Sequence, residues 1–185
     1  MSLTPDEAAT ALRDIETTAR RSASAYSYRS TSPFLILWGL AWAVGYGTTE
    51  LAPQLANPVW LGVTVVGCLA STIIGMRMKG GGAAARKFDW RIFTVWVASL
   101  VFLSAIFTIV GPVSGAQIGA VIPLVIAWAY VALGAWAGPR IMVIGVVLGA
   151  LTLAGYFEWP QHFAGWMAVV GGGTLVGTGF WLRRA

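Results

Sequence analysis

Three polar side chains stand out in a chain that is apolar over most of its length: Glu50, Glu158 and His162. Two carboxylates and an imidazole could bind a divalent cation, and His162 could also respond to the pH outside the cell. A zinc site normally has stronger ligands in a closer array, and the one cysteine, Cys68, excludes a site built from several cysteines. We therefore expect no metal and no cofactor here, and interpret these residues as water-exposed groups beside a membrane.

Aromatic residues provide the other candidate chemistry. Trp38, Trp42 and Tyr46 follow one another at spacings of four, which places them on one face of a helix. Such rings can line a pocket for a flat or cationic ligand, although they more often serve packing. Together with Glu50, Glu158 and His162 they form the candidate ligand-binding set. No nucleophile is accompanied by a base, so the sequence predicts a protein that is not an enzyme.

The composition indicates which surroundings these residues have. The chain has 185 residues, of which 57% are hydrophobic and 10% charged, whereas soluble domains carry about 25% charged residues. Too few charges are present to cover a surface in water, so the partner that we expect is the lipid bilayer. The net charge of +5 comes from short basic clusters between long apolar runs, which is unlike the basic face of a nucleic-acid-binding domain. Nucleic acid is therefore excluded as a partner.

Charged residues divide the chain into three long apolar blocks. Each block exceeds the roughly 20 residues that one helix needs to cross a bilayer. Proline and glycine interrupt each block near its middle, at 51–58, 111–115 and 157–161. The predicted fold is therefore an all-α membrane protein with six transmembrane helices arranged as three hairpins. The spans are expected at 33–50, 58–76, 92–110, 116–137, 141–157 and 162–182.

The positions of the cations predict the orientation. All twelve lysines and arginines fall on the same side of the six-span arrangement, and the three opposite connections contain none. The positive-inside rule then places both termini in the cytoplasm of a bacterial cell, with the chain in the inner (plasma) membrane. The glycine run at 80–82 lies in the basic segment 77–91, which lacks the lysine and serine or threonine of a phosphate-binding loop. We interpret this segment as a cytoplasmic linker.

Residues 1–32 form a polar head that precedes the bundle of 33–185. Leu12, Ile15 and Tyr26 fall roughly on one face of a short amphipathic helix, and residues 29–32 are expected to form a hinge before the first span. We expect this helix to rest on the cytoplasmic ends of its own bundle. The alternative is docking to a cytoplasmic protein partner through residues 4–28.

Glycines spaced four apart predict close helix contacts, because a missing side chain lets two backbones approach each other in lipid. The pairs expected to pack helices are Gly134 with Gly138, Gly145 with Gly149, and Gly173 with Gly177. Most of these contacts should lie within the bundle. A homo-oligomer that pairs through the fifth or sixth span stays open.

The run ALRDIETTARRSASAYSYRSTSPFLILWGLAWAVGY, residues 11–46, resembles the head and first span of small bacterial six-span membrane proteins without an assigned function. The three-hairpin layout is also similar in topology to acid-resistance membrane proteins of the HdeD type. Neither resemblance brings a functional residue. The function that we expect is that of a sensor or regulatory interaction module whose head contacts a cytoplasmic partner. Transport of a small or apolar solute through the bundle is the alternative.

Overall fold

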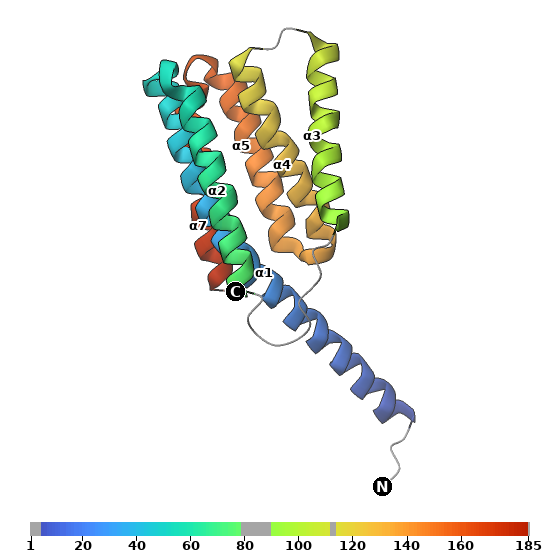
Figure 1. The fold of residues 1–185 in the computed structure, drawn as a ribbon. Helices are drawn as coiled ribbons and strands as arrows, with labels where there is room; N and C mark the ends of the chain where they lie inside the picture. The colour runs from blue at the N-terminus through green and yellow to red at the C-terminus, as the bar shows by residue number, and fades with distance from the viewer. Residues whose placement is uncertain (1–4, 79–89, 112–113, 185) are drawn as a thin grey trace.

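The chain folds entirely into helices in the part that the structure, a computed structural model, describes: residues 5–78, 90–111 and 114–184 (Figure 1). Seven α-helices follow one another, with short 3₁₀ segments at Pro53–Leu55 and Pro160–His162 and a π-helical segment at Met167–Gly171. The α-helices are α1 (Pro5–Leu51), α2 (Ala56–Met78), α3 (Trp90–Val110), α4 (Gly115–Ala137), α5 (Pro139–Glu158), α6 (Phe163–Trp166) and α7 (Gly172–Arg183). The all-α prediction is confirmed. The linker expected within 77–91 falls largely on 79–89, outside the described residues.

Four helical segments are long and apolar enough to cross a membrane: Pro53–Met78, Gly115–Ala135, Pro139–Glu158 and Pro160–Arg183. Their apolar surface is largely turned outward, and only 6% of the most apolar window of the first segment is buried inside the protein. An apolar surface of this extent needs lipid around it, so the chain is a membrane protein. The remaining two spans of the expected six, 33–50 and 92–110, stay predictions.

Helix α1 is continuous from Pro5 to Leu51, so the prediction of a hinge at 29–32 is wrong. The Ser32 hydroxyl is fully buried and donates a hydrogen bond of 2.6 Å to the carbonyl oxygen of Gly179 in α7. The hydroxyls of Ser30 and Thr31 donate to the carbonyl oxygen of Ser27 in the same helix. These polar residues therefore hold α1 in place where the sequence suggested a flexible joint.

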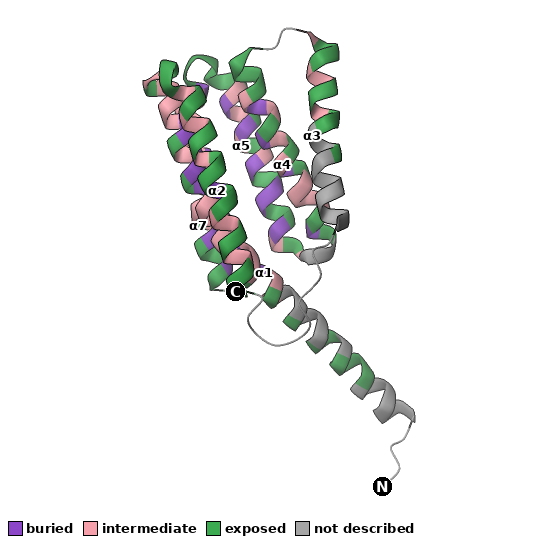
Figure 2. Cartoon of the chain, viewed as in Figure 1, coloured by how far each residue is buried: buried purple, intermediate pink, exposed green. Residues whose placement is uncertain are grey.

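The N-terminal part of α1 extends away from the bundle (Figures 1 and 2). Leu12, Ile15 and Tyr26 are 60%, 65% and 70% exposed. The prediction that a short separate helix rests on the ends of its own bundle is therefore wrong. Because Ser32 and Tyr28 attach α1 to the bundle from one side, the part before them continues along the helix axis into open space.

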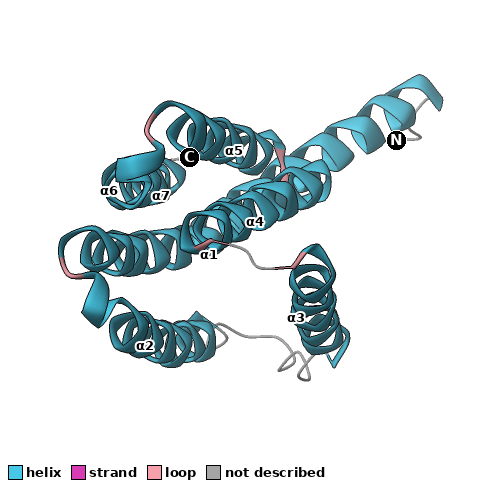
Figure 3. Cartoon of the chain, turned by 90° about the horizontal axis from the view of Figure 1, so that it is seen from above, coloured by secondary structure: helices cyan, strands magenta, loops and turns pink. Residues whose placement is uncertain are grey.

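The core lies where α1 contacts α7 on one side and α2 on the other, while α4 and α5 pack as a second pair (Figure 3). Among the described residues, Leu35, Leu148, Met167 and Leu182 are almost completely buried. Helix α3 lies at the edge, and several of its apolar side chains are exposed, as expected for a surface that faces lipid.

Two glycines bring the backbones of α1 and α7 close together. A Cβ atom placed on Gly39 would lie 2.8 Å from the carbonyl oxygen of Gly172, and one placed on Gly172 would lie 2.9 Å from that of Gly39. Such distances are shorter than any stable contact of a methyl group. Only glycine at both positions therefore permits this helix pair, and neither glycine belongs to the pairs spaced four apart that were expected to pack helices.

The expected helix-packing glycines divide into three groups. Gly134 and Gly145 lie against the backbones of α5 and α4, and Gly149 lies within ordinary contact distance of Ala127. Gly138 instead forms the turn between these helices with a φ of 122°, which favours glycine. Gly173 and Gly177 are exposed, and a Cβ at either would meet no described atom within 4 Å.

Replacement of Gly172 by alanine should lower the free energy of unfolding by about 1–3 kcal/mol, because the added methyl group would force α1 and α7 apart. The matched control is Gly173→Ala, one residue further along the same helix, which adds the methyl group in open space. Alanine there should leave the stability unchanged or raise it by up to about 1 kcal/mol. Unfolding in mixed micelles measures both variants, and equal destabilisation would contradict the assigned contact.

Candidate ligand-binding cavity

A cavity of about 740 Å³ opens at the end of the bundle opposite the C-terminus. Four parts of the chain surround it: the end of α1, the start of α2, the start of α4 and the connection from α5 to α6. Its volume is in the range of small-molecule sites. The lining consists of Trp42, Tyr46, Thr49, Glu50, Pro53, Ala56, Asn57, Trp60, Gly115, Ala116, Ile118, Gly119, Ile122, Pro160, Gln161, His162, Phe163 and Ala164.

Helix α1 contributes four residues to this lining, on one face of its last three turns: Trp42, Tyr46, Thr49 and Glu50. Trp42 and Tyr46 are 4% and 6% exposed. The Tyr46 hydroxyl donates a hydrogen bond of 2.6 Å to the carbonyl oxygen of Gly119, which attaches α1 to α4 across the inner end of the cavity. Trp42 and Tyr46 therefore have fixed positions, as a binding site for a rigid ligand requires.

The Tyr46 ring contacts three other aromatic rings edge to face. Its centroid lies 5.8 Å from that of Trp42, 5.0 Å from that of Trp60 and 6.5 Å from that of Phe163. Edge-to-face pairs at such distances each stabilise packing by about 0.5–1.5 kcal/mol. All four rings are part of the cavity lining.

Trp60 also lines the cavity, although it was not among the candidate site residues predicted from the sequence. Its ring lies against Gly45, where a Cβ atom would approach within 2.7 Å, and its Nε1 donates to the Thr49 hydroxyl at 3.0 Å. A glycine less than two turns before the end of α1 is a weak signal of this contact. Phe163 and Gly119 were missed as well, because they come from other hairpins.

Glu50 is held at the outer part of the cavity by two hydrogen bonds. One carboxylate oxygen, Oε1, lies 2.7 Å from Nδ1 of His162, and the other, Oε2, accepts from the backbone N–H of Gly165 at 3.0 Å. The bond from His162 and then that from Gly165 lower the pKa of the Glu50 carboxyl below its ordinary value. The carboxylate therefore keeps its negative charge at neutral pH. The His162 side chain is 75% exposed and the Glu50 side chain 24% exposed.

Two of the predicted site residues, Trp38 and Glu158, do not line the cavity. Glu158 is exposed at the end of α5, and His162 pairs with Glu50 of α1 instead. Trp38 lies on α1 below the cavity, where its ring packs against Gly67 of α2. Glu50 and His162 have no third potential ligand beside them among the described residues, because these contain no group of three His, Cys, Asp or Glu suited to a metal ion.

A π-helical segment, Met167–Gly171, lies next to the inner end of the cavity. Met167 is fully buried, and the methyl group at its end occupies the space beside Gly171, near the Trp42 ring. π-Helical turns carry an extra residue and occur often at functional sites. This one lets the last span contact α1 through Gly171 and Gly172.

Comparison with known proteins provides no assignment: no protein-family model, no curated protein and no solved structure matches the chain. The resemblance to proteins of the HdeD type stays a prediction from topology.

The Glu50 hydrogen bonds should make the stability of the protein depend on acid pH. Because the pKa of Glu50 is lowered by folding, its contribution is present above the ordinary glutamate pKa and is lost as the pH falls through the lowered value. Thermal unfolding in micelles between neutral and acid pH should therefore show a steeper loss for the natural chain than for Glu50→Gln. The exposed Glu158→Gln is the matched control and should follow the natural chain; three equal slopes would contradict the assignment.

Proposed function

We propose that this protein is a non-enzymatic sensor or regulatory interaction module of the bacterial inner membrane. Its cavity binds a ligand at the outer side, and α1 transmits occupancy to a protein partner in the cytoplasm. One observation carries the proposal: the same unbroken helix provides Trp42, Tyr46 and Glu50 to the cavity and then extends beyond the bundle as the exposed head. Its 47 residues correspond to a rod of roughly 70 Å.

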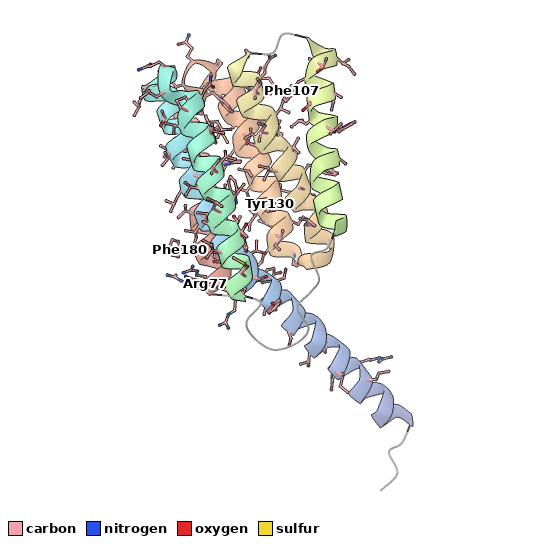
Figure 4. The ribbon with its side chains drawn as sticks, in the orientation of Figure 1. Arg77, Phe107, Tyr130 and Phe180 are labelled. Carbon is pink, nitrogen blue, oxygen red and sulfur yellow. The ribbon has the colours of Figure 1, made fainter. Side chains whose placement is uncertain are left out.

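The orientation in this proposal follows from the distribution of charge. Arg77, Arg140, Arg183 and Arg184 lie at the end where α1 leaves the bundle, as Figure 4 illustrates for Arg77. Glu50 and His162 lie at the opposite end. With 33–50 and α3 as the additional spans, the six-span arrangement puts every described cation in the cytoplasm, in agreement with the positive-inside rule.

Two contacts attach α1 to the bundle at its cytoplasmic exit. The Arg183 side chain donates through Nε to the Ser32 hydroxyl at 3.1 Å, and Ser32 donates in turn to Gly179. The Arg140 guanidinium lies 5.3 Å from the centroids of both the Tyr28 and Trp181 rings, close enough for cation–π attraction. A displacement of α1 by a ligand must therefore act against α5 and α7, which makes the exit a defined pivot for the head.

The head is suited to a protein partner. Its described apolar side chains Leu12, Ile15 and Tyr26 are largely exposed. Apolar side chains that share one helix face usually contact another surface. A helix that presents spaced apolar side chains can bind in the groove of a partner protein. Residues 4–28 are therefore the proposed docking segment.

Transport remains the second candidate, and the size of the cavity favours it. Below the cavity, however, Met167 and Leu148 are completely buried and fill the space between helices. Transport would thus need a second conformation. Solute flux through reconstituted protein that survives deletion of residues 1–28 and falls on replacement of Trp42 would favour this candidate.

A substitution that fills the cavity should move the head. A Cβ atom on Gly119 would lie 3.5 Å from Phe163 and 3.6 Å from Tyr46, so Gly119→Leu places a side chain between these rings. In a protein with Cys68→Ser, spin labels at Ile15→Cys and Arg77→Cys report the distance from head to bundle. We expect Gly119→Leu to shift this distance distribution by several ångströms, and Gly177→Leu, at an open position, to leave it unchanged.

The continuity of α1 is tested in the same labelled protein. Glycines at positions 29–31 should abolish the shift, because they loosen α1 within the pivot, between Tyr28 and Ser32. Alanines at the same three positions are the matched control and should preserve it. An unchanged distance in Gly119→Leu, or a shift that survives the three glycines, would contradict transmission through α1.

A further inference from the structure

The chemistry of the cavity lining restricts the ligand. As far as the structure describes it, the lining contains one carboxylate, Glu50, and no lysine or arginine. Both Glu50 oxygens accept one hydrogen bond each, so each retains a free lone pair. The described arginines of the bundle lie at the other end of the helices. The cavity therefore has a negative local charge with no built-in counter-ion except a protonated His162.

The aromatic surface adds a second preference. Trp42, Tyr46, Trp60 and Phe163 line the space next to Glu50, and the faces of such rings attract cations. The polar hydrogen on Tyr46 is already used by Gly119, and that on Trp60 by Thr49. The amides of Asn57 and Gln161 remain as neutral donors and acceptors, and the described lining contains no lysine or arginine to hold an anion. The lining suits a ligand with an apolar body and one positive charge.

We propose that the cavity binds an organic cation, a substituted ammonium with an apolar or aromatic body, whose charge lies near Glu50 and among the four rings. This inference deepens the proposed function and rests on it, since it names the ligand class of the same site. An anionic ligand would be repelled by Glu50. A bare metal ion would find no group of three His, Cys, Asp or Glu to hold it among the described residues, and a neutral apolar molecule would leave the carboxylate unused.

The test compares two probes of the same shape. Benzyltrimethylammonium carries the charge, and neopentylbenzene has a carbon atom in place of the nitrogen. Binding to the full chain in phosphatidylcholine nanodiscs is measured by saturation-transfer NMR, with partition into empty nanodiscs subtracted. The natural chain should bind the cation about tenfold more tightly than the neutral probe, as expected for a carboxylate and aromatic rings around a desolvated charge.

Two variants locate the site. Glu50→Gln can keep bonds to His162 and Gly165 through its amide but removes the charge, so it should reduce cation binding about tenfold and leave the neutral probe unaffected. Glu158→Gln removes an exposed carboxylate outside the cavity and should change neither. If Glu50→Gln fails to fold, the comparison of the two probes on the natural chain still tests whether the cavity prefers a cation.

Equal affinity for both probes, binding of neither, or equal loss in Glu158→Gln would overturn the proposal. Its failure is distinguishable from failure of the proposed function, because the spin-label experiment uses a built-in side chain and no added ligand. Cation binding without movement of the head would refute transmission and leave the ligand class standing. Movement of the head without charge selectivity would refute the ligand class and leave transmission standing.

Discussion

Close backbone contact between α1 and α7 is the interaction on which the rest of the structure depends. Lipid removes most of the hydrophobic drive for helix association, so van der Waals contact and interhelical hydrogen bonds must provide it. Gly39 and Gly172 permit the approach. Further along the same helix pair, Ser32 of α1 donates a hydrogen bond to Gly179 of α7. With α1 fixed in this way, its outer turns line the cavity and its first turns leave the bundle in a defined direction.

The two ends of the bundle differ in the charged groups that they carry. At one end, Arg140 and Arg183 stabilise the exit of α1 through aromatic rings and a hydroxyl group. At the other, Glu50 is held by groups that lower its pKa. An arginine side chain can reach water from a helix end while its stem stays in apolar surroundings. The same residues can therefore favour one orientation in the membrane and anchor α1.

Much of the fold could be predicted from the sequence, because helix ends depend on local signals. The predicted spans agree with the observed helices to within about two residues at most ends, as the prolines and glycines of the connections require. The hinge could not be excluded in this way, since Ser30, Thr31 and Ser32 read as a break locally. In the structure, Ser30 and Thr31 bond to Ser27 within α1, and Ser32 bonds to Gly179 of α7, 147 residues away. A tertiary contact decided that region.

The candidate site was predictable only in part for the same reason. Trp42, Tyr46 and Glu50 share one helix face, so their spacing placed them together. The partner of His162 is Glu50, which lies 112 residues away, whereas the near neighbour Glu158 is exposed at the end of α5 and does not line the cavity. Trp60 and Phe163 join the cavity through packing between hairpins, which no pattern within one helix reveals.

The central claim is that one helix has its cavity residues on the outer side of the membrane and its head in the cytoplasm. Single cysteines at Asn57, Ser114, Gln161 and Ile15, introduced into a chain with Cys68→Ser, test it with a membrane-impermeant maleimide. The account predicts that the first three label in intact spheroplasts and that Ile15 labels only after the membrane is permeabilised. Labelling of Ile15 from outside, or protection of the three loop positions until permeabilisation, would contradict it.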